Sequence, residues 1–435
     1  MTGGHVLSSF LFGLCYGALL WAQQPAAAPL TLEECIKRAT EAPSAVVAAR
    51  QSLEATRYGV KGAVSAFLPK TVVNNGFTLN SAFNTAPIPG TPFIGLNGTH
   101  EYQTLINSSV EIDTSGRLRA ELAKSRSERD IAQVELRLQT RDLRQQVTLA
   151  YLQALLTRHL RDSARESLDE AQHFEQLTEK LYNGGEVARA DVVKAQAQVA
   201  FSQQLLQQSE LDARLANQQL ASFWTTDVDQ PLDLADLLKA EPNAPPGDRM
   251  TQTTVTPQVY LKRPELLRFD AEHRSALADY RIARADLFPT FTAAYEYGID
   301  APIYSWSYRG QAVFLALTVP IFDFFHTRDS YKQLQIRAQI VETNRNIAER
   351  QYSREYQSAL ARVESSLSQV KSSREQVRLS ESNLNLAKIR YQGGEGTALD
   401  VVTAVQQAAQ AKVNYFTAYA NYFSADADLK VAEGQ

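Results

Sequence analysis

The chain has few cysteines, no excess charge of either sign and no long apolar run in its body. Its two cysteines are Cys15 and Cys35, and Cys15 lies in a segment expected to be removed, so neither a disulfide framework nor a cysteine metal site is expected. Charged residues make up 21 % of the chain and the formal net charge is -4, which leaves no basic field for nucleic acid. After Trp21 no run of about 20 apolar residues occurs, so no transmembrane helix is expected.

Motifs for catalysis and metal binding are also lacking. We find no nucleophile beside a base and no glycine loop that would hold a phosphate. Five of the histidines have no metal-ligand spacing: His100, His159, His173, His273 and His326. The sequence therefore predicts neither an enzyme nor a cofactor site.

The N-terminus resembles an export signal. Residues Val6 to Trp21 are apolar but too few and too interrupted for a transmembrane helix, and Ala22 or the cluster at 26–28 offers small residues for cleavage. The first Lys or Arg is Lys37, so the positive start typical of a signal is missing, and a retained anchor is the alternative. We predict a signal peptide over 1–22, and any membrane crossing by the rest of the chain must then use strands.

Two stretches of the chain are near copies of each other. Leu181–Glu186 followed by Asp191–Val193 matches Arg390–Glu395 followed by Asp400–Val402, and Tyr391 follows Tyr182 by 209 positions. This constant offset predicts a duplication, with a first repeat over 23–222 and a second over 258–435. The proline-rich residues 223–257 form the linker. Each repeat is expected to hold a helix, a β-hairpin and two further helices.

Long helical patterns dominate both repeats. A helix is predicted over Leu32–Phe67, with Thr31 as its N-cap, and single helices of about 65 residues over Arg117–Tyr182 and Thr327–Tyr391. Apolar residues recur every seven positions in three stripes, which predicts coiled-coil packing of helices side by side. The stripes are Tyr356, Val363, Val370, Val377, Leu384 and Tyr391; Val192, Val199, Leu206, Ala213 and Leu220; and Val402, Ala409, Phe416 and Phe423.

Strand patterns separate the helices of each repeat. Apolar and polar residues alternate over 70–113, for example Phe77 and Leu79 against Thr78 and Asn80, and again over 290–320. We predict two hairpins, with turns at Thr85–Gly98 and Ile299–Ser307. A soluble sandwich shows the same alternation, but ten-residue strands flanked by aromatics in an exported chain favour an outer-membrane barrel. Four strands cannot close a barrel, so several copies must contribute.

The order of these motifs resembles the TolC family of outer-membrane efflux proteins over residues 30–432. The shared features are Leu30–Glu34 opening a helix, Ala66–Pro69 and Asp286–Pro289 before the hairpins, Gly116-Arg117 after the first hairpin, and the duplicated Tyr-x-Gly-Gly-Glu segments. The second repeat departs from the pattern where Asp323-Phe324-Phe325 contains no glycine. The resemblance implies a mainly α protein, a homotrimer with a coiled-coil α-helical barrel and a 12-stranded β-barrel.

The resemblance also implies a gate at the periplasmic end of the helical barrel. Asp191 and Asp400 fall on family aspartate positions, and Tyr391 falls on a tyrosine that links to the first of them; Tyr182 is its repeat counterpart. Thr403 replaces a second gate aspartate and Gly396 replaces a linking arginine of the best-known member, so a weaker latch is expected, or Arg189 or Lys194 supplies the charge. The alternative is that both aspartates only cap the following helices.

The glycine pairs are expected at tight turns between helices. Gly184, Gly185, Gly393 and Gly394 permit positive φ, and in the family such turns, here with Glu186 and Glu395, contact the periplasmic adaptor.

The sequence thus predicts a passive exit duct for a tripartite efflux or type I secretion system. Its expected partners are two further copies, outer-membrane lipid, a periplasmic adaptor and an inner-membrane transporter. The expected location is the outer membrane of a Gram-negative bacterium, extending into the periplasm. The alternative is a periplasmic coiled-coil adaptor or scaffold that never enters the membrane.

Overall fold

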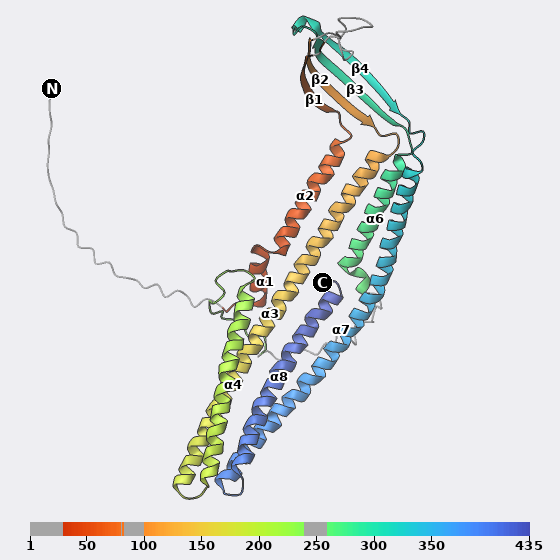
Figure 1. Cartoon of the computed structure of the whole chain (residues 1–435). Helices are drawn as coiled ribbons and strands as arrows, with labels where there is room; N and C mark the ends of the chain where they lie inside the picture. The colour runs from red at the N-terminus through yellow and green to blue at the C-terminus, as the bar shows by residue number, and fades with distance from the viewer. Residues whose placement is uncertain (1–28, 80, 82–99, 239–258) are drawn as a thin grey trace, which may run out of the picture.

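The computed structural model describes residues 29–79, 81, 100–238 and 259–435. The predicted signal peptide 1–22, the turn predicted at 85–98 and the second half of the predicted linker lie outside the described residues. Along the described chain, the helices and strands follow the order helix, hairpin, helices in both halves (Figure 1). The first half contains α1 Leu32–Glu41, α2 Ala45–Ser65, β1 Lys70–Leu79, β2 His100–Ile112, α3 Arg117–Asn183 and α4 Arg189–Ala221. The second contains η1 Val259–Lys262, α6 Pro264–Ala285, β3 Thr290–Ala301, η2 Trp306–Tyr308, β4 Arg309–Thr318, α7 His326–Gln392 and α8 Ala398–Ala432.

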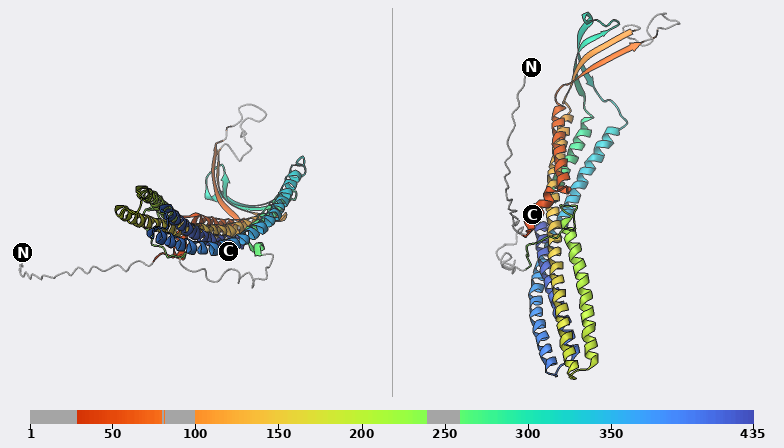
Figure 2. Two further views of the ribbon diagram at one scale, coloured as in Figure 1. Left: turned by 90° about the horizontal axis from the view of Figure 1, so that it is seen from below. Right: turned by 90° about the vertical axis from the view of Figure 1, so that its left-hand side faces the viewer.

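The two longest helices, α3 and α7, have 67 residues each, or about 100 Å at 1.5 Å per residue. They confirm the two long helices predicted from the sequence. The sheet lies at one end of them, and the α3–α4 and α7–α8 turns lie at the other (Figure 1). Viewed from below, the helices follow an arc (Figure 2, left). A protomer is therefore a curved, elongated wall.

The predicted single helix over 32–67 is wrong, because the helix is interrupted at residues 42–44. Thr31 caps α1 as predicted, since its hydroxyl accepts the Glu34 N–H at 3.3 Å. Pro43 disfavours helical backbone in the residue before it, and Ala42 takes an extended ψ of 159°. Helix α2 then starts anew at Ala45.

The four strands form one antiparallel sheet in the order β1-β2-β3-β4. Strand β2 joins the two repeats, since Tyr102 pairs with Phe77 on one side and with Ala301 on the other. The second hairpin turn starts later than predicted, because β3 continues through Ala301. Strands β1 and β4 each have one edge that no other described strand covers.

The seven-residue stripe of α7 is confirmed as a packing seam. Tyr356, Val363, Val370, Leu384 and Tyr391 are buried, and Val377 is half-buried. In the middle of the molecule, the largest cluster of buried side chains joins α1, α3, α4, α7 and α8; a second cluster lies near the helix turns. Supercoiled helices of this kind keep such a stripe facing their neighbours along their whole length.

The described part of the linker packs against the middle of the helices. Leu30 and Leu234 form a parallel bridge, with the Ala235 N–H donating to the Leu30 carbonyl at 2.9 Å. The buried Tyr151 hydroxyl of α3 lies 3.0 Å from the Leu30 carbonyl and 2.6 Å from the Ala235 carbonyl. Burial raises the pKa of this phenol well above its usual range.

The second strand-to-helix transition has the same backbone shape as the first, although it has no glycine. Gly116 precedes α3 with φ 80°, and its repeat counterpart Phe325 precedes α7 with φ 70°. Phe324 is also left-handed, with φ 53°. Bulky side chains rarely adopt this conformation, so the second transition is strained.

Within the described ranges, no helix has an apolar stretch that would take it across a membrane.

Candidate functional site at the helix turns

The two duplicated turns close their helices with the same hydrogen bonds. In the first, the Gly185 N–H donates to the Tyr182 carbonyl and the Glu186 N–H to the Leu181 carbonyl, both at 2.9 Å. In the second, the Gly394 N–H donates to the Tyr391 carbonyl at 3.1 Å and the Glu395 N–H to the Arg390 carbonyl at 2.9 Å. This pair of bonds is the Schellman motif, which satisfies the last carbonyls of a helix.

Only the second glycine of each pair needs positive φ. Gly185 and Gly394 have φ of 79° and 74°, as predicted. The same prediction is wrong for Gly184 and Gly393, whose φ values are -78° and -81°. Gly184 still has helical backbone and Gly393 also keeps a negative φ, because the reversal of direction happens one residue later in this motif.

Asp400 caps the helix that follows its turn. Its carboxylate accepts the Thr397 N–H at 2.9 Å, and the Thr397 hydroxyl accepts the Asp400 N–H at 3.2 Å, which is a reciprocal capping box. These bonds to the Thr397 backbone and side chain hold the pKa of Asp400 below its usual range, with Arg390 contributing less. The capping role predicted for Asp400 is confirmed.

Asp191 does not cap its helix, so the predicted capping role is wrong at this position. The residue at the N-cap is Ala188, which has no side-chain oxygen, and the Asp191 carboxylate instead pairs with Lys194 at 3.3 Å. This pairing places a positive charge beside Asp191, as the sequence allowed.

Tyr391 is buried between the repeats. Its ring packs edge-on against Phe174 of α3, with 5.2 Å between ring centres, and only 4 % of the residue is exposed. Among the described residues its hydroxyl has no partner of good hydrogen-bond geometry, while the neighbouring Thr178 hydroxyl donates to the Phe174 carbonyl at 2.8 Å. Burial raises the pKa of Tyr391, and the nearby Asp191 carboxylate raises it further. The Asp191 carboxylate is therefore near enough to Tyr391 to interact with it electrostatically.

The other predicted residues lie at the surface. Tyr182, the repeat counterpart of Tyr391, is 42 % exposed. Thr403, Glu186 and Glu395 are also exposed. Tyr182 and Tyr391 are therefore the same residue type at equivalent positions, but only Tyr391 is buried. Glu186 and Glu395, next to the glycines, have exposed side chains.

Gly396 lies at a tightly packed position of the second turn. Its N–H donates to the Arg390 carbonyl at 3.0 Å, and a Cβ added to it would lie 3.0 Å from the Tyr391 backbone nitrogen. Real Cβ atoms rarely come this close to backbone, so an arginine would force the turn to move. The close backbone at position 396 therefore disfavours the linking arginine that the family resemblance places there.

Three contacts that sequence reasoning missed join the two repeats above the turns. Lys388 of α7 pairs with Glu170 of α3, and Lys412 of α8 pairs with Glu166 of α3 at 2.6 Å. The Gln406 amide of α8 donates to the Gln198 amide oxygen of α4 at 2.9 Å. No motif marks these residues, because their partners lie more than 200 positions away.

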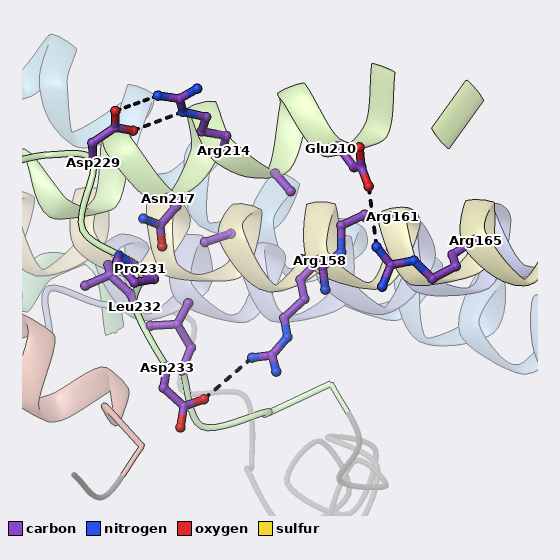
Figure 3. A pocket seen from close by; sticks show the side chains of 13 residues that line it. Arg158, Arg161, Arg165, Glu210, Arg214, Asn217, Asp229, Pro231, Leu232 and Asp233 are labelled. Carbon is purple, nitrogen blue, oxygen red and sulfur yellow. Dashed lines mark hydrogen bonds and ion pairs between the residues drawn. The ribbon is translucent and has the colours of Figure 1, made fainter. Parts of the chain in front are cut away.

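An arginine-rich groove of about 820 Å³ lies between α3, α4 and residues 229–234 (Figure 3). Its arginines already have acidic partners: Arg158 with Asp233 at 3.9 Å, Arg161 with Asp162 at 2.7 Å, Arg165 with Glu210 at 3.4 Å and Arg214 with Asp229 at 2.5 Å. The groove is therefore close to neutral, and two of its ion pairs, Arg158 with Asp233 and Arg214 with Asp229, attach the linker to the helices.

In the part of the chain that the structure describes, no group of three or more His, Cys, Asp or Glu side chains could hold a metal ion.

A curved wall of long helices, a four-stranded sheet with open edges and paired turns at the far end define an outer-membrane channel protomer. The chain matches the model of the outer membrane efflux protein family over residues 35–226 and 255–435, and it belongs to that family. The predicted resemblance and fold class are confirmed. The outer membrane and the adjoining periplasm are its location.

Individual relatives agree with this assignment. The chain is 25 % identical to the pyoverdine export outer membrane protein OpmQ of Pseudomonas aeruginosa over 309 residues, which is 68 % of this chain and 62 % of OpmQ. Its fold is similar to the Campylobacter jejuni channel CmeC, with a TM-score of 0.80, 16 % identity and coverage of 99 % of this chain and 94 % of that one. For VceC of Vibrio cholerae the TM-score is 0.77, with 19 % identity and coverage of 93 % and 96 %.

Proposed function

We propose that three copies of this chain form a passive exit duct for an efflux or type I secretion system. The observation that carries the proposal is one protomer with both an open-edged sheet and a curved helical wall about 100 Å long. A periplasmic adaptor, the alternative function, has no need of a four-stranded sheet shared by two repeats. We propose no enzymatic activity.

Exposed apolar residues along the protomer edges support the homotrimer. On α4 they are Val193, Phe201, Leu205, Leu211 and Leu215, and on α7 they are Ile336, Ile340, Ile347, Leu379, Leu386 and Ile389. On α7 every spacing between successive members, and on α4 two of the four, lies within half a residue of a multiple of three and a half, which is the spacing of a coiled-coil seam. Helix α4 of one copy would pack on α7 of the next, while β1 pairs with β4 of its neighbour. Three copies then give the predicted 12 strands and leave no open edge.

Aromatic residues at both ends of the second hairpin support membrane insertion. Tyr304, Trp306 and Tyr308 are exposed beyond one end of the strands. Phe322, Phe324 and Phe325 are exposed at the other end, where β4 leads into α7. The ten residues of β4 span about 33 Å, enough to cross a hydrocarbon layer when tilted. Aromatic rings are favoured at the two membrane interfaces, so this hairpin fits outer-membrane lipid.

The helix turns are the proposed gate and partner contact. Gly184, Gly185, Gly393, Gly394 and the exposed Glu186 and Glu395 would meet the periplasmic adaptor, which connects the duct to an inner-membrane transporter. Asp191, Asp400, Tyr391, Tyr182 and Thr403 would form the periplasmic gate. Three Asp400 carboxylates around a threefold axis would favour cations over anions.

The first experiment is extraction of the protein from outer membranes and measurement of its mass and conductance. We expect a heat-resistant trimer in detergent that forms cation-selective channels in planar bilayers. A monomer that stays soluble without detergent would refute the duct. Among substrates, pyoverdine should be tested first because the relative OpmQ is named for its export.

The gate is tested by Asp191→Ala, with Glu186→Ala at the neighbouring turn as control. We expect a higher single-channel conductance from the Asp191 variant alone, because it loses the charge beside Tyr391. Unchanged conductance and drug permeability would show that Asp191 does not hold the gate.

A further inference from the structure

The contact between Gln198 and Gln406 is a part-buried hydrogen bond across the two repeats, in which Gln198 is buried and Gln406 is exposed. Gln198 is only 4 % exposed, and its amide nitrogen donates to the Ser202 hydroxyl at 3.3 Å. Its amide oxygen accepts the Gln406 amide at 2.9 Å. A buried amide oxygen that loses its donor is costly, so Gln198 depends on Gln406.

The contact lies close to the proposed gate. Gln198 follows the start of α4 by nine residues and Gln406 follows the start of α8 by eight, which places both about 12–14 Å above the turns. Near them, Ala195, Val405 and Ala408 are buried, so water has poor access to the Gln198 side chain.

Duplication alone does not explain this bond. At the offset of 209 positions, the counterpart of Gln198 is Gln407 and that of Gln406 is Ala197. Gln407 is exposed and lies 3.5 Å from Asn383 of its own helix pair. The bond between the repeats therefore occurs once in a protomer, between α4 and α8.

We propose that Gln198 and Gln406 form a neutral clasp that holds the α3–α4 and α7–α8 pairs together when the gate is closed. The clasp rests on the proposed duct function and adds a gating contact to it. It supplies an uncharged link above a turn that has Gly396, and no arginine, after Glu395. Opening requires the two helix pairs to separate near the turns, which breaks the amide bond and exposes Gln198 to water.

The test is Gln406→Leu, with Gln407→Leu as a matched control: it is the next residue of α8, also a glutamine and also exposed, but its contact is with Asn383 of its own helix pair. Loss of one net hydrogen bond should favour the open gate by about 2- to 13-fold per protomer. We expect more frequent opening of Gln406→Leu channels in planar bilayers and unchanged opening of Gln407→Leu channels. Because the clasp is neutral, the ratio between the Gln406 variant and the unchanged protein should be the same in 0.1 M and 1 M salt, to within about a factor of two.

A second measurement protects the test from a folding defect. Cysteines at both positions, Gln198→Cys with Gln406→Cys, should form a disulfide that reduces conductance and releases it on reduction, while the buried native Cys35 stays unreactive. Equal opening of both leucine variants, or a crosslinked channel that conducts normally, would overturn the clasp and leave the duct intact. An unchanged protein that forms no channel would refute the duct and the clasp together.

Discussion

Replacing Gly394 with alanine should loosen the second helix turn, whereas replacing Gly393 should not. Gly394 has φ 74°, and an added Cβ would have no atom within 4 Å. The cost of the change is therefore the left-handed conformation itself, about 1–2 kcal/mol for a residue with a Cβ. Gly393 has φ -81°, and its added Cβ would make ordinary contact at 3.5 Å with the Ile389 carbonyl oxygen.

Comparing Gly394→Ala with Gly393→Ala removes the effect that each substitution has on the unfolded chain. Both substitutions reduce the freedom of the unfolded chain by a similar amount, about 0.4–1 kcal/mol, so this effect cancels between them. The difference that remains is the strain of about 1–2 kcal/mol at Gly394. Such a difference corresponds to roughly 5- to 30-fold in the population of the locally open turn.

Hydrogen exchange at the turn measures this population. The Glu395 and Gly396 amides both donate to the Arg390 carbonyl, at 2.9 and 3.0 Å, and they are released when the turn opens. We expect their exchange in Gly394→Ala to be about 5- to 30-fold faster than in Gly393→Ala. Equal exchange in the two variants would refute the assignment of the strain to positive φ.

Three further substitutions test other parts of the structure. Tyr151→Phe should destabilise the middle of the protomer by about 1–3 kcal/mol, seen as a lower Tm, because the part-buried Ala235 carbonyl loses the buried Tyr151 hydroxyl at 2.6 Å; an unchanged Tm would contradict this. Because the pKa of Asp400 is lower in the folded chain, its cap should stabilise α8 above pH 3.8 and be lost as the pH falls below it; Asp400→Asn should remove this acid dependence of amide exchange at the start of α8. Phe325→Gly should relieve about 1–2 kcal/mol of backbone strain and raise resistance to denaturant, with Phe322→Gly, whose φ is not positive, as the control.

Periodicity was sufficient to predict the long helices and the sheet from the sequence. The stripes at seven-residue spacing and the alternating strands are local patterns, and the structure has helices and strands where they predicted them. The break at Pro43 was missed because α1 and α2 share one apolar pattern that continues across it. The positive φ of Phe325 was also missed, because phenylalanine rarely adopts it. The requirement comes from the position between β4 and α7, which is equivalent to that of Gly116 in the first repeat.

The site was predictable where backbone shape demands one residue type. Gly185 and Gly394 are such positions, since positive φ strongly favours glycine. The contacts of Glu170, Lys388 and Gln198 with the opposite repeat could not be predicted, because they depend on how two helix pairs come together in space. A sequence pattern within one helix contains no information on that register.

The two aspartates of the duplicated turns have diverged in what surrounds them. Thr397 caps α8 together with Asp400, but its counterpart at the first turn is Ala188, which has no oxygen to offer. Thr403 follows Asp400 by three positions, while the counterpart of Thr403 is Lys194, which pairs with Asp191. The Asp400 carboxylate is thus bonded to the Thr397 N–H and hydroxyl at the start of its own helix, so it stays in place when the helix pairs move. Among the described residues, the half-exposed Lys194 is the one ion-pair partner of the Asp191 carboxylate, so we expect Asp191, more than Asp400, to change partners when the gate opens.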